Sequence, residues 1–362
     1  MKRILLQRVL PAAITIGLLA LVFVWVEDPA EIPRQIAQVP WHIHVLFVLV
    51  TMISMLLRAC RWRALLPNRN LTARQCVGPI FIGFMMNSLL PARAGEFARS
   101  IALSRKTKIP FASAFGSVVL ERVFDGLFLL GSFVFVLGVM GVAMTEESVK
   151  FGEHEISGDL METAAKSSSI IILVMLVGIV AILFPGPRRL AESVARAVLP
   201  ERAGTVVVNQ LEKLIQGFHA LHSPRAIVSV VLWTLGIWVL VALSVWIGSF
   251  GFEEFEITYM QAWAIMVFIC VAIMLPASPG YWGLYEVGVI VSFLALGIAA
   301  DVENPRSVAL SFSLVIHFWQ YGPIVVTGLI FLWVEGLALA QLRKVEAAEL
   351  PNDPEPPVPY GA

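Results

Sequence analysis

The sequence predicts an all-α protein, a polytopic bundle of transmembrane helices built as an inverted repeat. Hydrophobic residues make up 58% of its 362 positions and charged residues only 14%, whereas soluble domains carry about 25% charged residues. Several apolar runs approach the roughly 20 residues that a spanning helix needs. One phrase also occurs twice, as Leu90-Pro91-Ala92-x-x-Gly95 and as Leu275-Pro276-Ala277-x-x-Gly280. Pro/Gly-interrupted apolar segments in corresponding positions of two halves are typical of transporters.

Six apolar runs are candidates for full spans. The first follows Lys2 and Arg3 and has no small-residue cleavage pattern after it, so we interpret it as an uncleaved helix rather than a signal peptide. The second and fourth are short and need flanking residues to complete them. The six runs are Val9–Val26, Val45–Leu57, Phe115–Ala143, Ile170–Phe184, Ile227–Phe250 and Val308–Val334.

Two further regions are too short for ordinary spans. They are Val77–Leu90 and the pair Gln261–Leu275 with Leu284–Ile298. At about 1.5 Å per residue, such segments cover about 22 Å of a hydrocarbon core of about 30 Å. They are either re-entrant or tilted and broken spans, which gives roughly eight membrane helices with the six full spans.

The distribution of basic residues predicts the orientation. With the N-terminus inside and the short regions re-entrant, most of the 26 Lys and Arg residues face the cytoplasm, in the N-terminus, 58–76, 92–114, 185–225 and the C-terminal tail. Outer loops are acidic instead. This bias predicts a multi-pass protein of the bacterial inner (cytoplasmic) membrane with both termini in the cytoplasm.

The predicted topology divides the chain into a transmembrane domain, 1–340, and a proline-rich, disordered cytoplasmic tail, 341–362. Within the domain, half-repeats at roughly 41–143 and 226–334 run in opposite directions. That is the architecture of alternating-access transporters. The alternative is that the repeated phrase arose by chance.

The first Pro/Gly-interrupted segment, which we call the first break, contains polar residues suited to an anionic ligand. Asn87 can satisfy a backbone group freed by Pro91, and Arg93 and Arg99 can offer guanidinium groups to a lipid phosphate. Glu96 precedes Arg99 by one helical turn and can hold it in place. The alternative is that both arginines are anchors at a cytoplasmic helix end.

The third long span contains the charged residues Glu121, Arg122 and Asp125. Ionisable residues inside membrane helices usually face a bundle interior, so the three predict an intramembrane charge network. The alternative is that Gly126–Met144 spans the membrane alone and leaves the three at the interface.

The second break precedes Glu286, which opens the next apolar helix. Glu286 is either a functional carboxylate or only a helix cap, and Tyr281, Trp282 and Tyr285 then form an interfacial aromatic belt. His317 lies in the last span, and a lone histidine in such a position usually forms a hydrogen bond with a neighbouring helix. The residues that break the helix are Pro276, Pro279, Gly280 and Gly283.

Missing motifs argue against catalysis. The sequence has no P-loop, no Asp-x-Asp and no Ser or Cys nucleophile motif, and its three cysteines lack metal or redox spacing. We therefore expect a protein that is not an enzyme and that has no cofactor, metal ion or nucleic-acid partner.

Together these motifs resemble the lysylphosphatidylglycerol synthase transmembrane-region family, also called flippase-like membrane proteins, over roughly residues 5–340. In bifunctional members this region is associated with moving an aminoacylated phospholipid that a separate soluble domain makes. The chain is similar to stand-alone members, some of which are linked to polyprenyl-phosphate sugars and others to hopanoid or envelope lipids. The second break departs from the usual Gly-Gly-x-Gly. The resemblance assigns the motif to Asn87, Pro91, Arg93, Gly95, Glu96, Arg99, Glu121, Arg122, Asp125, Gly280 and Glu286.

The expected function is to flip an anionic, phosphate-bearing lipid between leaflets. Arg93, Arg99 and Arg122 would neutralise the headgroup near the midplane, and carboxylates would hold them or exchange protons. The alternatives are a non-transporting accessory subunit that docks a lipid- or glycan-modifying enzyme, and an enzyme acting on a lipid carrier. The oligomeric state is left open. The carboxylates with this expected role are Glu96, Asp125 and Glu286.

Overall fold

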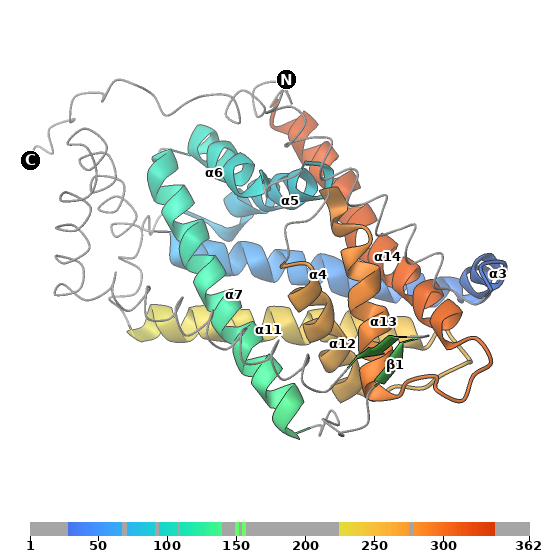
Figure 1. Ribbon diagram of the computed structural model, residues 1–362. Coiled ribbons are helices and arrows are strands. Elements are labelled where there is room, and N and C mark those ends of the chain that lie inside the picture. Colours follow the sequence, from blue (N-terminus) through green and yellow to red (C-terminus); the bar gives the residue numbers. More distant parts are fainter. Residues whose placement is uncertain are drawn as a thin grey trace, which may run out of the picture.

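The computed structural model describes residues 28–66, 71–90, 94–107, 109–139, 149–151, 154–156, 224–274 and 279–336. The expected spans Val9–Val26 and Ile170–Phe184 and the tail 341–362 lie outside these ranges. Figure 1 shows that the described chain is a bundle of helices, as the sequence predicts, with one two-stranded hairpin beside it.

The helices of the first half are α3 (Glu31–Gln38), α4 (Trp41–Leu65), α5 (Ala73–Leu89), α6 (Gly95–Lys106) and α7 (Phe111–Val139). The hairpin consists of β1 (Val149–Phe151) and β2 (His154–Ile156). The second half contains α11 (Pro224–Ser249), α12 (Tyr259–Ala272), the short 3₁₀ helix η3 (Pro279–Tyr281), α13 (Leu284–Leu296) and α14 (Pro305–Val334).

Three described helices are long and apolar enough to cross a membrane, namely Trp41–Leu65, Arg225–Ser249 and Pro305–Val334. The first differs from the predicted span Val45–Leu57 because it continues for eight residues past Leu57. Arg58 and Arg61 therefore lie on a buried face of α4, and their assignment to a cytoplasmic segment was wrong. Carboxylates from another helix compensate Arg61, as described below.

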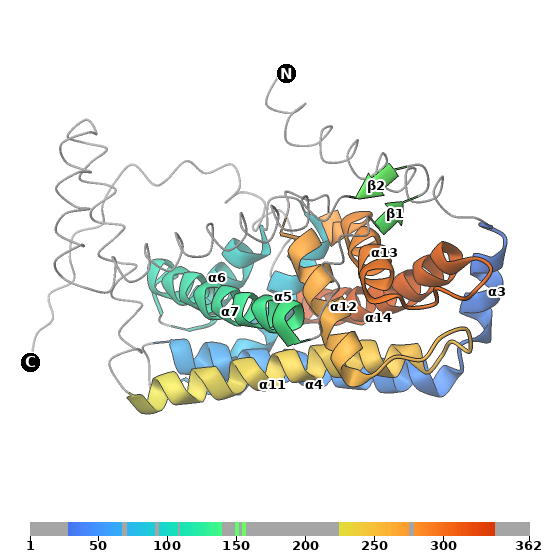
Figure 2. The ribbon, with the colours of Figure 1, turned by 60° about the horizontal axis from the view of Figure 1, so that its bottom comes forward.

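The long helices α4 and α11 lie side by side and run in opposite directions (Figures 1 and 2). Near the start of α4, Phe47 belongs to the same buried cluster as Val245, near the end of α11. At the other end of α4, Leu65 packs with Val230, near the start of α11.

Two ends of the bundle can be distinguished. At the first, which we call the α3 end, α3 packs on the first turns of α14, and the backbone N–H of Asp28 donates to Ser307 Oγ at 3.1 Å. At the second, which we call the Lys106 end, Lys106 Nζ lies 2.5 Å from Glu335 Oε1, just after α14. Helix α14 therefore crosses from the α3 end to the Lys106 end.

Helices α5 and α6 form a re-entrant hairpin that enters and leaves at the Lys106 end. Cys76, in the first turn of α5, belongs to one buried cluster with Leu103, in the last turn of α6, and with Ile109. Within 92–114, Arg99 is buried inside the bundle, so its assignment to a cytoplasmic segment was wrong. Charged residues lower the hydropathy of α6, but its inner face is buried at Ala98 and Ala102.

Helices α12 and α13 form a second re-entrant hairpin, which enters and leaves at the α3 end. Phe255, just before α12, contacts Phe293 near the end of α13, with ring centroids 5.0 Å apart. Closer to the tip, Gly288 packs against the backbone of Ile269. The two short regions of the sequence are thus re-entrant hairpins inserted from opposite ends.

The same pattern of neighbours recurs in both halves. Helices α4, α5, α6 and α7 correspond to α11, α12, α13 and α14, and in each set the first packs on the second, the second on the third, and the third and first on the fourth. The second helix of each set also starts with the same capping box, Thr72 with Gln75 and Thr258 with Gln261. The described helices therefore form an inverted repeat, which argues against a chance origin of the repeated phrase.

Candidate functional site

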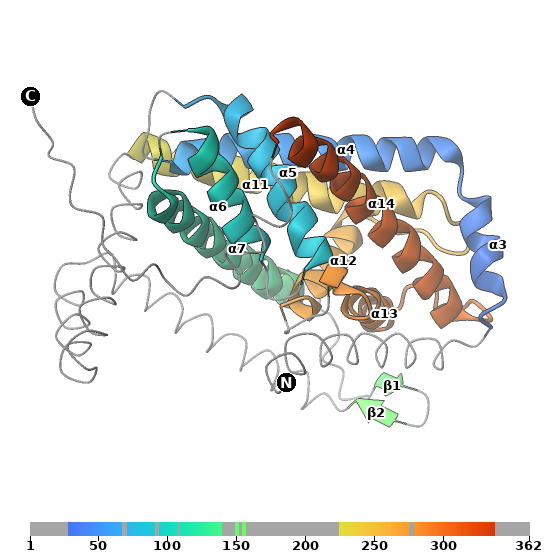
Figure 3. The ribbon, with the colours of Figure 1, turned by 90° about the horizontal axis from the view of Figure 1, so that it is seen from above.

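The tips of the two re-entrant hairpins meet inside the bundle. A Cβ placed on Gly280, in η3, would lie 3.3 Å from the carbonyl oxygen of Ser88, at the end of α5. Figure 3 shows α5 beside α14, and contacts link α5 to both α14 and η3. Both interrupted segments of the sequence therefore face one central region.

Asn87 and Gly95 join the two arms of the first hairpin. The backbone N–H of Gly95 donates to Asn87 Oδ1 at 2.8 Å, so the amide side chain satisfies a first-turn donor of α6 and not a group freed by Pro91. A Cβ on Gly95 would collide with the carbonyl oxygen of Gly83. The absence of a side chain therefore lets α5 and α6 approach closely.

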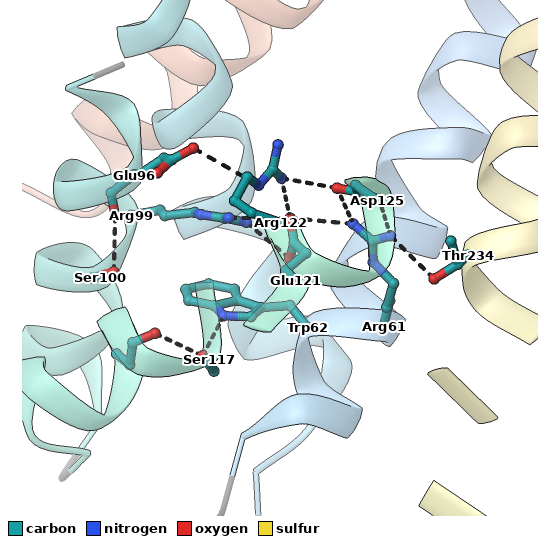
Figure 4. Close-up of polar contacts among 11 residues, drawn as sticks. Arg61, Trp62, Glu96, Arg99, Ser100, Ser117, Glu121, Arg122, Asp125 and Thr234 are labelled. Atoms are coloured by element: carbon teal, nitrogen blue, oxygen red, sulfur yellow. Dashed lines mark hydrogen bonds and ion pairs between the residues drawn. The ribbon is translucent and has the colours of Figure 1, made fainter. Parts of the chain in front are cut away.

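Beside this hairpin lies a buried cluster of charged side chains from α4, α6 and α7 (Figure 4). At its centre, Glu121 is fully buried and contacts three arginines. Its two carboxylate oxygens accept from Arg99 at 3.1 and 3.2 Å, and Oε1 also lies 3.2 Å from Arg61 and 2.5 Å from Arg122. One carboxylate thus connects three helices.

Asp125 forms the second centre of the cluster. It accepts hydrogen bonds from both terminal nitrogens of Arg61, at 2.5 and 3.1 Å, and its Oδ2 lies 3.3 Å from Arg122 Nη2. Arg61 Nη1 also donates to Thr234 Oγ1 on α11 at 3.2 Å. Because α11 belongs to the second half, Arg61 links the two halves.

The charged residues of α7 lie near the middle of the helix, which extends from Phe111 to Val139. Glu121 and Asp125 are buried, and the Arg122 side chain is 33% exposed. The three charges therefore form a network inside the bundle, and their depth in the membrane stays a prediction.

One predicted pair is wrong. Arg99 is 2% exposed and pairs with Glu121 on α7 and not with Glu96 one turn away on its own helix. Glu96 Oε1 instead lies 3.8 Å from Arg122 Nε. Arg99 points into the bundle and lies over the Trp62 ring, so the buried carboxylate is the one it reaches.

The cluster contains one residue that sequence reasoning missed, Arg61. Helical spacing in the sequence could have indicated that Arg61 is buried, because it shares a face of α4 with other residues that the structure buries. These are Ser54, Arg58, Trp62 and Leu65. The carboxylate partners are 60 and more residues away in sequence and on another helix, so spacing alone could not name them.

The second hairpin holds a buried carboxylate–imidazole pair. Glu286 Oε1 lies 2.6 Å from His317 Nδ1, and His317 Nε2 donates to the carbonyl oxygen of Gly280 at 2.8 Å. Glu286 Oε2 accepts the backbone N–H of Gly283 at 2.6 Å. Glu286 is therefore a helix cap that also pairs with the last span, and its functional role stays a prediction.

Hydrogen-bond chemistry fixes the proton content of this pair. Because Gly280 O can only accept, His317 Nε2 carries a proton, and a further proton must lie between Nδ1 and Glu286. The pair is either imidazolium with carboxylate or neutral imidazole with carboxylic acid. In both forms it holds one shared proton.

Aromatic rings enclose the imidazole. The rings of Trp282 and Tyr285 both stack on the imidazole of His317, and each ring centroid lies 4.2 Å from the imidazole centroid. Tyr285 is buried, so it does not belong to an interfacial belt. Trp282 also lines an apolar pocket of about 360 Å³ together with Ile36, His44, Leu314, Val315, Phe318 and Trp319.

The remaining predicted residues divide into two groups. Gly280 and Gly283 have φ values of 72° and 88°, as expected for glycines that break a helix, and Pro279 begins η3. Pro91, Arg93 and Pro276 lie outside the described residues. Within the described ranges, no group of three His, Cys, Asp or Glu residues is placed to hold a metal ion.

Comparison with known proteins gives the family. The model of the family described as Lysylphosphatidylglycerol synthase TM region matches residues 9–328. The chain belongs to this family. No solved structure matches it.

The chain is also similar to a curated member of the same family, the protein named Glycosyltransferase AglD from the archaeon Haloferax volcanii. The two are 27% identical over 307 residues, which are 78% of this chain and 48% of the relative. The chain thus spans about half the length of the curated relative that it matches.

This member of the lysylphosphatidylglycerol synthase TM region family differs from the glycine-rich pattern at one position with a structural consequence. Tyr281 has a φ of 61°, in the left-handed region that glycine adopts readily and other residues adopt at a cost of about 1–2 kcal/mol. Its ring lies 6.0 Å from that of Tyr321. The second tip therefore contains a non-glycine residue in a left-handed conformation.

Proposed function

We propose that this membrane protein moves an anionic, phosphate-bearing lipid between the leaflets of the bacterial inner membrane, with both termini in the cytoplasm, and that it is not an enzyme. The observation that carries the proposal is the meeting of two re-entrant hairpins, inserted from opposite ends, beside a buried arginine cluster. Irregular backbone at membrane depth is tolerated where it is buried in protein or lines a polar cavity.

Arg122 is the cluster arginine best suited to meet a headgroup. Its side chain is 33% exposed, whereas Arg61 and Arg99 are enclosed by their carboxylates. Arg93 remains a proposed ligand from the sequence. The apolar pocket beside Trp282 has a lining suited to part of a lipid chain.

Reconstitution tests the proposal. The full chain is placed in phosphatidylcholine vesicles containing fluorescent phosphatidylglycerol, and a membrane-impermeant reductant bleaches the outer leaflet. We expect the protein to bring inner-leaflet probe within reach of the reductant, and Arg122→Gln and Arg93→Ala to slow this transfer at least tenfold. Arg34→Gln, an exposed arginine at the α3 end, serves as a matched control and should transfer lipid normally. Equal transfer by all variants, or none by the wild type with any anionic lipid, would refute the proposal.

A second candidate is a non-transporting subunit that works with a lipid- or glycan-modifying enzyme. The similarity to half of a protein named as a glycosyltransferase favours it. In that case the vesicles would show no transfer, and the chain would co-purify with a transferase from its own membrane.

A further inference from the structure

Arg58 is a buried cation for which the described part of the chain supplies no direct ion-pair partner. It lies on α4, one turn before Arg61, and is 8% exposed. Among the described residues, no carboxylate lies within ion-pair distance of its guanidinium and no acceptor hydrogen-bonds to it.

The neighbouring carboxylates are already in use. Glu121 is shared by three arginines, Asp125 by Arg61 and Arg122, and Glu96 faces Arg122. These three acids balance three arginines, and Arg58 is the fourth. A buried charge without a partner is costly, so the surplus positive charge indicates a ligand that the fold is built to receive.

Two aromatic rings hold Arg58 without using its hydrogen bonds. Its guanidinium carbon lies 5.1 Å from the ring centroid of Phe84 on α5 and 5.9 Å from that of Trp238 on α11. Rings attract the face of a guanidinium, which leaves the N–H donors in its plane free. These nitrogens keep some accessible surface, whereas Nε of Arg61 is enclosed.

Nearby indoles also lack acceptors. Within the described residues, the buried Nε1 atoms of Trp238 and Trp263 have no hydrogen-bond partner. Phe128 packs against both rings, with centroid separations of 5.5 and 5.7 Å. The Arg58 nitrogens and Trp238 Nε1, which lie beside each other, are all donors, so the component that would satisfy them is an acceptor-rich anion.

We propose that Arg58 is an anion-binding residue at the junction of the two halves and that its guanidinium receives two oxygens of a phosphate group. Phe84 comes from the first half and Trp238 from the second, so the guanidinium that would bind the anion contacts both halves. That the phosphate belongs to a lipid rests on the proposed function.

Binding to the purified full chain in a neutral maltoside detergent tests this site. The probes are dihexanoylphosphatidylglycerol, inorganic phosphate and, as the uncharged control, dihexanoylglycerol, each titrated by calorimetry. We expect Arg58→Gln to weaken binding of the phospholipid by about thirtyfold or more, the effect of losing one partner from a buried charge pair. Arg58→Lys should bind at an intermediate level, and Arg225→Gln, an exposed arginine on α11, should bind like the wild type.

The stability of the ligand-free protein gives an independent readout. Removing an uncompensated buried charge should leave the melting temperature of Arg58→Gln equal to that of the wild type or raise it, whereas Arg61→Gln should lower it. An Arg58→Gln protein that melts far below the wild type or fails to fold would overturn the proposal, because Arg58 would then already be neutralised within the fold.

The remaining outcomes separate the ligand sources and the two proposals. Competition by inorganic phosphate identifies a free-phosphate site, and binding of the phospholipid alone identifies a lipid site. Phospholipid binding that is unchanged in Arg58→Gln overturns the inference. Arg58-dependent binding without lipid transfer in vesicles refutes the proposed function and leaves the anion site standing.

Discussion

At the scale of single residues, Glu121 is the side chain on which most buried charge depends. It is fully buried and contacts three arginines from α4, α6 and α7. Asp125 supports only two of these arginines, so it cannot replace Glu121. The charge balance inside the first half therefore depends on one carboxylate.

We predict that Glu121→Gln destabilises the protein by about 3–5 kcal/mol, because it leaves buried arginines without a counter-charge. Thermal unfolding in detergent measures the effect. Glu253→Gln removes a carboxylate from an exposed loop and should unfold like the wild type. If both variants melted at the wild-type temperature, the cluster would not be the buried network described here.

Glu286 offers a second prediction, based on its shared proton. In Glu286→Gln the new amide would keep an acceptor for the Gly283 N–H and a donor for a neutral His317, so this variant should cost less than about 1.5 kcal/mol. Glu286→Ala loses both contacts and should cost about 2–4 kcal/mol. Chemical unfolding of the two variants side by side checks the order, and equal losses would contradict the proton assignment.

At the scale of elements, the first hairpin depends on the close approach of α5 to α6. We predict that Gly95→Ala destabilises the protein by at least about 2 kcal/mol, because its Cβ would collide with backbone of α5. Gly126→Ala is the matched control on α7, where nothing lies within 4 Å of the added methyl. That variant should gain about 0.5–1 kcal/mol from helix propensity. Thermal melts that ranked the two in the opposite order would exclude the close contact.

The elements also show what sequence alone can reveal. The Pro/Gly phrases mark both hairpin tips, since proline and glycine interrupt helices whatever surrounds them. The length of an apolar run could not decide between a re-entrant arm and a tilted span, because that depends on packing across the bundle.

Two misassignments have one physical cause. A prediction from hydropathy treats each charged side chain as exposed. The predicted span therefore ended at Leu57, and the residues of α6 were assigned to a loop. Arg61 and Arg99 are buried because α7 supplies carboxylates, and that pairing is a tertiary contact. By contrast, the triplet of α7 could be predicted, since its charges interrupt a long apolar segment.

At the scale of the whole molecule, the antiparallel halves make a prediction about accessibility. In a background with Cys60, Cys76 and Cys270 replaced by serine, single cysteines at Gln38 and Glu253 should react with an impermeant maleimide from one side of the membrane. Cysteines at Arg74 and Arg225 should react only from the other side, because they lie towards the Lys106 end. The basic-residue bias predicts that the first pair faces away from the cytoplasm. Labelling of Arg74→Cys and Glu253→Cys from the same side would contradict the inverted repeat.

The two halves share a scaffold but not their chemistry. In the described chain, the interface between the hairpin and the long helix contains an arginine-rich cluster in the first half and a single proton-sharing pair in the second. Under the proposed function, a headgroup that enters from the Lys106 end would meet arginines first, and one that enters from the α3 end would meet imidazole and aromatic rings. If the protein transports lipid as proposed, the two directions of transport would therefore differ chemically although the backbone is pseudosymmetric.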